Sequence, residues 1–160
     1  MREEATLNVY LIRHAHALGA DVDAMRPLSP RGREQVHALA DFLAPSGVFQ
    51  PAEFWHSPLV RSRQTAELLA RRLQLDVPHL LVPDLEPESD PHAAARRLNV
   101  VKHAVAIVGH EPHLSALATL LIGSKAGLPV FVMKKCSVLA LEGIDVHWSV
   151  RWHISPDLIA

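Results

Sequence analysis

Short apolar runs and amphipathic segments alternate along most of this 160-residue chain. The run Leu7–Ile12 stops abruptly at Arg13 and is typical of a strand that is buried on both faces of a parallel sheet. Residues 53–56, 79–82 and 104–108 form further short runs, and we expect a strand in each. Because parallel strands need crossover connections, the alternation predicts an α/β fold.

The segments between these strands carry apolar residues every three or four positions, the spacing of one helix face. Ser29-Pro30 and Ser57-Pro58 each combine an N-cap residue with a proline suited to the first helical turn, so we expect helices to begin there. By the same criteria, a short helix is predicted over 90–98 and another over 112–123.

The C-terminal segment changes to strict alternation, with apolar residues at Val146, Trp148, Val150, Trp152 and Ile154. A period of two predicts a strand with one buried face, preceded by a turn over 142–145 and a partner strand over 138–141. The whole pattern predicts a three-layer α/β/α sandwich whose mostly parallel central sheet ends in an antiparallel C-terminal hairpin. No repeat or linker divides the sequence, so we expect one domain over 1–160.

Composition narrows the possible functions. The formal net charge is −1 and the basic residues are scattered, which argues against nucleic acid or an anionic membrane as a partner. The single cysteine, Cys136, excludes an internal disulfide, and its apolar surroundings predict an inert buried thiol. The sequence shows neither a membrane-length apolar run nor a signal-peptide pattern at its start, so we expect a cytoplasmic protein, and a monomer.

Polar residues gather where the predicted strands end. The first strand delivers Arg13 and His14, the second delivers Ser57 with Arg61 one helical turn later, and the fourth delivers His110. Ligands of such sheets bind at the carboxyl ends of the strands. Arginine forks match phosphate oxygens, a helix start adds backbone N–H groups, and a neutral imidazole is a competent nucleophile. The set predicts a phosphoryl-transfer site that needs no metal or other cofactor.

With these segments in view, the chain resembles the histidine phosphatase superfamily, and most closely its short bacterial phosphohistidine phosphatase (SixA-like) branch. The segments occur in family order and span about two-thirds of the chain. The resemblance rests on LIRHAHA at 11–17, LSPRGREQ at 28–35, SPLVRSRQTA at 57–66 and VGHEPHL at 108–114.

This resemblance implies a phosphoglycerate-mutase-like fold without an inserted cap domain. It implies that His14 is the phosphate-accepting nucleophile and that Arg13, Arg61 and His110 complete the phosphate pocket, with Ser57 as a further candidate for substrate binding. The implied activity is a hydrolase that removes phosphate from phosphohistidine on a signalling or phosphorelay protein. An open pocket would admit such a side chain.

Two positions, Ala15 and His16, depart from the family pattern, and the residue that serves as general acid is not decided by the sequence. The family usually has glycine after the nucleophilic histidine, and Ala15 would be strained there if the position requires a positive φ. His16 either tunes the charge of the pocket or is a solvent-facing loop residue. Glu86 is the first candidate and Asp84 the second for the acid that protonates the leaving group, and the alternative is a solvated acidic loop.

Other functions fit parts of the same pattern. The substrate could be a small phosphomonoester such as a sugar phosphate, or the chain could be a phosphate-binding module whose catalysis has decayed. A histidine-rich metal protein is a further alternative, but the eleven histidines are too scattered to favour it. An imidazole leaving group, with a reference pKa of about 6.5, departs more easily than an alkoxide, so a site without a dedicated acid suits phosphohistidine.

Overall fold

The computed structural model describes residues 5–123 and 130–159. Within them a six-stranded sheet has the strand order β3-β2-β4-β1-β5-β6. Strands β3, β2, β4 and β1 run parallel, β5 is antiparallel to β1, and β6 is antiparallel to β5. The bounds are β1 (Thr6–Arg13), β2 (Glu53–His56), β3 (His79–Leu81), β4 (Val105–Gly109), β5 (Val138–Ile144) and β6 (His147–Ile154).

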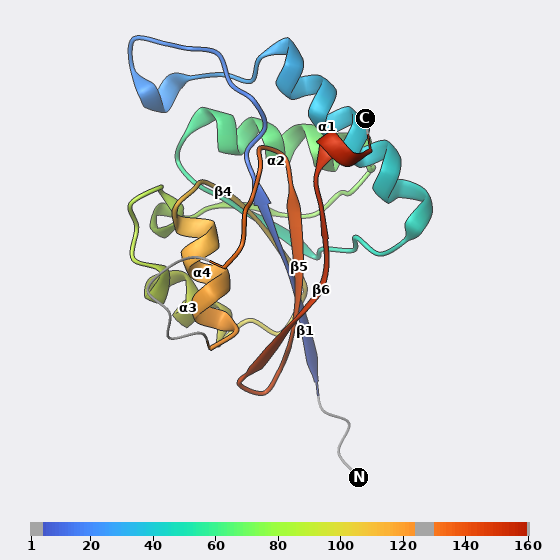
Figure 1. Cartoon of the computed structure of the whole chain (residues 1–160), viewed down its shortest axis with the longest axis vertical. Coiled ribbons are helices and arrows are strands. Elements are labelled where there is room, and N and C mark those ends of the chain that lie inside the picture. The colour runs from blue at the N-terminus through green and yellow to red at the C-terminus, as the bar shows by residue number, and fades with distance from the viewer. Residues whose placement is uncertain (1–4, 124–129, 160) are drawn as a thin grey trace.

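Helices cover both faces of this sheet (Figure 1). One face packs against α1 (Pro30–Leu43) and α2 (Val60–Arg72), and the other against α3 (Pro91–Leu98) and α4 (His113–Leu121). Successive side chains of β1 point to opposite faces of the sheet. Tyr10 and Ile12 therefore join the α1–α2 core, whereas Val9 and Leu11 join the α3–α4 core. The predicted three-layer α/β/α sandwich with its antiparallel hairpin is therefore confirmed. In the described ranges, no helix has the length and apolar character needed to cross a membrane.

The predicted caps are correct for two helices and wrong for a third. The Ser29 hydroxyl accepts the Gly32 N–H at 3.0 Å at the start of α1, and the Asp90 carboxylate caps α3 by accepting the His92 N–H at 3.0 Å. Ser57, in contrast, is not the cap of α2, which begins at Val60 after Leu59. The reason is that the Ser57 hydroxyl bonds to His110 and accepts the Leu59 N–H at 3.2 Å, outside the helix.

The C-terminal hairpin differs from the sequence prediction in two respects. First, β5 continues to Ile144, so the turn predicted over 142–145 is wrong, and the chain reverses at Asp145, whose φ is 55°. Second, the predicted single buried face of β6 is wrong, because Trp148 packs on the α3–α4 core and Trp152 on the α1–α2 core. Val146, outside the strand, is 82% exposed.

A β-bulge explains the change of face. Trp152 pairs with Ala140 and Val150 pairs with Leu141, so Arg151 is the extra residue opposite a single step of β5. An extra residue reverses the side-chain alternation of the strand beyond it. The sequence pattern carries no mark of this insertion, because every second residue stays apolar through it.

The hairpin also brings its ends to one edge of the sheet. Because β5 is antiparallel to β1, its first residue, Val138, pairs with Ile12 near the carboxyl end of β1. The last residue of β6, Ile154, pairs with Val138. The segments 130–137 and 155–158 therefore meet the loops that leave the parallel strands, and the Cys136 N–H donates to the Arg13 carbonyl at 2.9 Å.

Candidate active site

His14 is the first residue after β1, and its hydrogen bonding fixes the state of its ring. Its backbone N–H donates to the Gly109 carbonyl at 2.9 Å, and its side chain is buried. The ring Nδ1 lies 2.7 Å from the Ala15 carbonyl oxygen. Because a carbonyl can only accept, Nδ1 carries the proton of this hydrogen bond, and the lone pair of the neutral ring lies on Nε2.

The environment of His14 favours that neutral ring. Burial is the largest influence and lowers its pKa from 6.5 to about 4, with the charges of Arg61, Arg13 and Lys135 acting in the same direction against the Ala15 hydrogen bond. At neutral pH the ring is therefore uncharged, and its Nε2 lone pair lies in the field of the Arg61, Arg13 and Lys135 charges. A neutral imidazole of this kind is chemically able to act as a nucleophile.

His110 follows β4 and faces His14. The two ring centroids are 5.1 Å apart, and the His110 side chain is buried. Its Nε2 bonds to the Ser57 hydroxyl at 2.5 Å, so Ser57, predicted to contact substrate, contacts His110. Burial, followed by the charges of His14 and Arg61, lowers the pKa of His110 to about 3. His110 is therefore also neutral at pH 7.

Arg61 lies in the first turn of α2 and is held by a residue that sequence reasoning missed. Its Nη1 donates to the Asp23 carbonyl at 3.0 Å and its Nη2 to the Asp23 carboxylate at 3.3 Å. Asp23 opens the 3-10 helix η1 (Asp23–Met25), and the Arg61 charge lowers the pKa of its carboxyl group. Asp23 stands in a polar loop with no motif around it, so no sequence signal distinguishes it.

Three buried nitrogens at this site have no hydrogen-bond partner among the described residues: Arg13 Nε, Arg61 Nε and His110 Nδ1. Unpaired buried donors are uncommon in native proteins. A phosphoryl group carries three strong acceptor oxygens, which matches a site of two guanidinium groups and an imidazole. In the same ranges no three His, Cys, Asp or Glu side chains gather into a potential metal site.

Ala15 is not strained by the absence of glycine. The residues described with a positive φ other than glycine are Gln74, Cys136 and Asp145, so Ala15 does not occupy the left-handed region. It is completely buried, and its N–H donates to the Thr65 hydroxyl at 3.0 Å. An alanine therefore fits this position, and Thr65 is a second residue that the sequence did not single out.

His16 is tied to the start of α1 and is half-buried. Its Nδ1 lies 2.6 Å from the Ser29 hydroxyl, and its N–H donates to the Gln35 side chain at 2.9 Å. A Cβ on Gly32 would lie 2.0 Å from the His16 carbonyl oxygen, so this crossing requires glycine. The loop that carries His14 to His16 is thus fixed against the first turn of α1.

Neither candidate acid forms a hydrogen bond or ion pair with His14 among the described residues. Glu86 follows the 3-10 helix η3 (Pro83–Leu85), its side chain is exposed, and no hydrogen bond or ion pair of that side chain is found in this part of the chain. The Asp84 carboxylate accepts from Arg97 Nε at 3.0 Å. Arg63, two positions beyond Arg61, is exposed and pairs with Glu67 at 3.2 Å.

A family model and several solved structures match this chain. The family model of the histidine phosphatase superfamily (branch 1) matches residues 9–86, which include three of the four residues of the predicted pocket: Arg13, His14 and Arg61. No curated protein sequence matches the chain. The predicted resemblance to this superfamily is therefore confirmed by the family model, and it supports a phosphatase hydrolase.

Solved structures share the fold over nearly the whole chain. The structure of the protein histidine phosphatase SixA complexed with tungstate has a TM-score of 0.87 and 23% identity, covering 96% of this chain and 99% of that one. A SixA structure from Agrobacterium tumefaciens has a TM-score of 0.79 and 23% identity, covering 93% and 97%. A phosphoglycerate mutase from Bacillus anthracis has a TM-score of 0.73 and 13% identity, covering 92% of each chain. The predicted phosphoglycerate-mutase-like fold is confirmed.

Proposed function

We propose that this chain, which matches the histidine phosphatase superfamily, is a phosphatase whose His14 becomes transiently phosphorylated, and that it dephosphorylates phosphohistidine on a signalling or phosphorelay protein. One observation carries the proposal: the hydrogen bond from Nδ1 of His14 to the Ala15 carbonyl leaves a neutral ring with its Nε2 lone pair available. The resemblance to the SixA structures supports the choice of substrate.

The reaction has two displacement steps. In the first, Nε2 of His14 forms a bond to phosphorus as the bond between phosphorus and the substrate nitrogen breaks. In the second, water attacks the phosphorus and the bond between phosphorus and Nε2 breaks. The water oxygen becomes part of inorganic phosphate, the water protons pass to phosphate or solvent, and neutral His14 is regenerated. Arg13 and Arg61 offset the negative charge of the phosphoryl oxygens in both steps, and His110 donates a hydrogen bond to them.

The leaving group distinguishes this substrate from an ordinary ester. An imidazole has a reference pKa of about 6.5, so it leaves as a stable ring once solvent supplies a proton. An alkoxide is far more basic and gains much from a positioned acid. Glu86 is exposed, and its side chain forms no hydrogen bond or ion pair with a described residue, which is consistent with the easier leaving group.

Rapid quench under alkaline conditions, which preserves phosphohistidine, tests the intermediate directly. We expect ³²P from a labelled phosphohistidine protein to appear on His14 in the parent and to be absent from His14→Ala. His147→Ala, at an exposed histidine on β6, is the matched control and should label normally. Label that persists in His14→Ala, or turnover without any labelled enzyme, would contradict the proposal.

A small phosphomonoester is the second candidate substrate, favoured by the fold shared with a phosphoglycerate mutase. If Glu86 serves as an acid, Glu86→Gln should slow ester hydrolysis more than phosphohistidine hydrolysis, because only the ester needs protonation of a strongly basic oxygen. A panel of esters against one phosphohistidine protein measures both. Equal losses on the two substrates would exclude Glu86 as the acid.

A further inference from the structure

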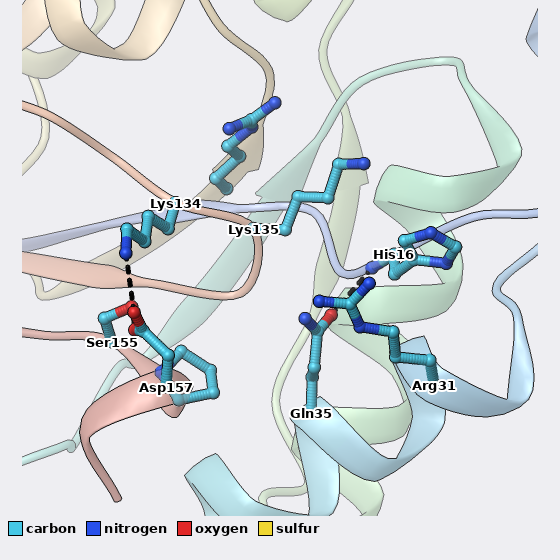
Figure 2. A pocket seen from close by; sticks show the side chains of 9 residues that line it. His16, Arg31, Gln35, Lys134, Lys135, Ser155 and Asp157 are labelled. Atoms are coloured by element: carbon cyan, nitrogen blue, oxygen red, sulfur yellow. Dashed lines mark hydrogen bonds and ion pairs between the residues drawn. The ribbon is translucent and has the colours of Figure 1, made fainter. Parts of the chain in front are cut away.

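Figure 2 shows a cavity of about 320 Å³. Arg13 of the phosphoryl site is one of its lining residues. Its walls come from four separate parts of the chain: the end of β1, the start of α1, the loop before β5 and the segment after β6. The lining residues are Arg13, His16, Arg31, Gln35, Lys134, Lys135, Ser155, Pro156 and Asp157. We call this the outer cavity.

Positive charge in the outer cavity is only partly compensated. Asp157 is the one acidic lining residue, and it is already engaged by Lys134 Nζ at 2.6 Å and by the Ser155 hydroxyl. Figure 2 shows Lys134 turned to this pair, whereas Lys135 extends away from it on the side where His16 lies. Neither Lys135 nor Arg31 forms an ion pair with another described residue.

Repulsion between like charges also indicates that the positive charge of the outer cavity is only partly compensated. Burial lowers the pKa of Lys135, and the neighbouring arginines, led by Arg13 and including Arg31, lower it further. Cations that lower one another's pKa gain from an anion placed between them.

The backbone holds these cations in place. The Cys136 N–H donates to the Arg13 carbonyl at 2.9 Å, and the Ser137 N–H donates to the Lys134 carbonyl at 3.0 Å, which closes the turn that carries both lysines. On the opposite wall, Gln35 accepts the His16 N–H at 2.9 Å. The outer cavity is therefore a built feature of the sheet edge, with a fixed position relative to His14.

We propose that the outer cavity is a second anion-binding subsite, in which Arg31 and Lys135 bind a carboxylate of the substrate protein while its phosphohistidine lies at His14. The proposal rests on the proposed function, because it places the phosphoryl group of the same substrate at His14. Arg13 touches both spaces, so the two anions lie side by side. The subsite would select phosphohistidines that have an Asp or Glu close by on the substrate surface.

Two phosphohistidine peptides test this selection: one has acidic residues next to the phosphohistidine and the other has the corresponding amides. We expect the parent to prefer the acidic peptide in kcat/KM by about fivefold per engaged carboxylate, an effect carried by KM and weakened by salt. Arg31→Gln and Lys135→Gln should each reduce this preference, and the double variant should abolish it. Lys102→Gln is the control and should keep the preference, because Lys102 is an exposed lysine before β4 that does not line the outer cavity.

The outcomes separate this inference from the proposed function. Labelling of His14 by either peptide tests the function, whereas the ratio between the peptides tests the subsite. A parent enzyme that labels normally but shows no preference for the acidic peptide would overturn the subsite alone. A preference for the acidic peptide that survives in the double variant would also overturn the subsite. So would a higher kcat/KM for small esters with two phosphates, over esters with one, in a parent that shows no preference for the acidic peptide. Thermal melts of each variant confirm folding.

Discussion

The phosphoryl site and the outer cavity share Arg13 but differ in their contact with water. His14, Arg61 and His110 are buried, and burial is the main reason for the lowered pKa of both histidines. Arg31 and Lys134 are exposed and Lys135 is half-buried. Charges interact strongly in a dry site and weakly in a wet one. The comparison indicates that chemistry is concentrated in the buried region, and that the wet region can contribute only modest selection among substrates.

Replacing one arginine in each region gives the sharpest test of this contrast. Arg61→Ala should lower kcat/KM by roughly 100-fold or more, because it removes a buried cation that stabilises the transferring group. Arg31→Ala should change it by only about fivefold. Steady-state kinetics on one phosphohistidine protein measures both, with Arg63→Ala as the control, since Arg63 is two positions from Arg61 but exposed and paired with Glu67. Equal losses for Arg61 and Arg31 would break the comparison.

The pH dependence of activity should reflect the buried region. Nucleophilic attack needs the neutral ring of His14, whose pKa is lowered to about 4, so this group should produce an acid limb of kcat/KM near pH 4. Arg13→Gln should move the limb to higher pH, because the positive charge of Arg13 lowers that pKa. A limb from His14 near pH 6.5 would show that the site is wetter than the structure indicates.

Stability should change with pH for the same reason. The unfolded chain binds a proton at each histidine near pH 6.5, whereas folded His14 and His110 bind one only near about 4 and about 3. Between these values the unfolded state holds more protons, so the free energy of unfolding should fall as the pH falls from about 6.5 to about 4. Chemical denaturation at several pH values measures this, and the paired variant His14→Gln should show a weaker dependence.

The junction between the two regions offers a smaller test. Gly32→Ala would place a Cβ 2.0 Å from the His16 carbonyl, so the loop or α1 must shift, at a cost of about 1–3 kcal/mol in unfolding free energy. Denaturation and kinetics on the two peptides would show whether the shift disturbs the outer cavity more than labelling of His14. Gly19→Ala, where no atom lies within 4 Å of the added Cβ, is the control.

The smallest effect is expected at Cys136. Its thiol is completely buried, and burial raises its pKa to about 12, so a thiol reagent should leave native activity unchanged and modify the protein only after denaturation. Mass spectrometry before and after denaturant gives the readout. Rapid modification of the folded protein would mean that the structure around Cys136 opens readily to solvent.

The buried region was predictable from the sequence, whereas the outer cavity was not. Arg13 ends β1, and His14 and His110 directly follow β1 and β4, two strands with clear apolar runs. Parallel strands bring their carboxyl ends to one edge of the sheet. Lys135 lies at the same edge because it precedes β5, which runs antiparallel to β1. Asp157 lies there because it follows β6, which runs antiparallel to β5. Sequence spacing does not reveal that placement, because it depends on the order and direction of the paired strands.

Local competition explains the other differences. Ser57-Pro58 has the residues of a helix start, yet the Ser57 hydroxyl bonds to His110, a residue 53 positions away. Asp23 binds Arg61 across 38 positions. Such long-range partners override local preference and cannot be read from composition or periodicity.

The bulge at Arg151 has a consequence beyond the packing of two tryptophans. It sets the register of β6 against β5, and hence the point at which the chain leaves the sheet. Ser155 and Asp157 follow directly, so one residue more or less in β6 would carry Asp157 out of reach of Lys134. The number of residues in an edge strand thereby sets the charge of a cavity at the far end of the hairpin. Insertions and deletions there would tune recognition without touching the residues around His14.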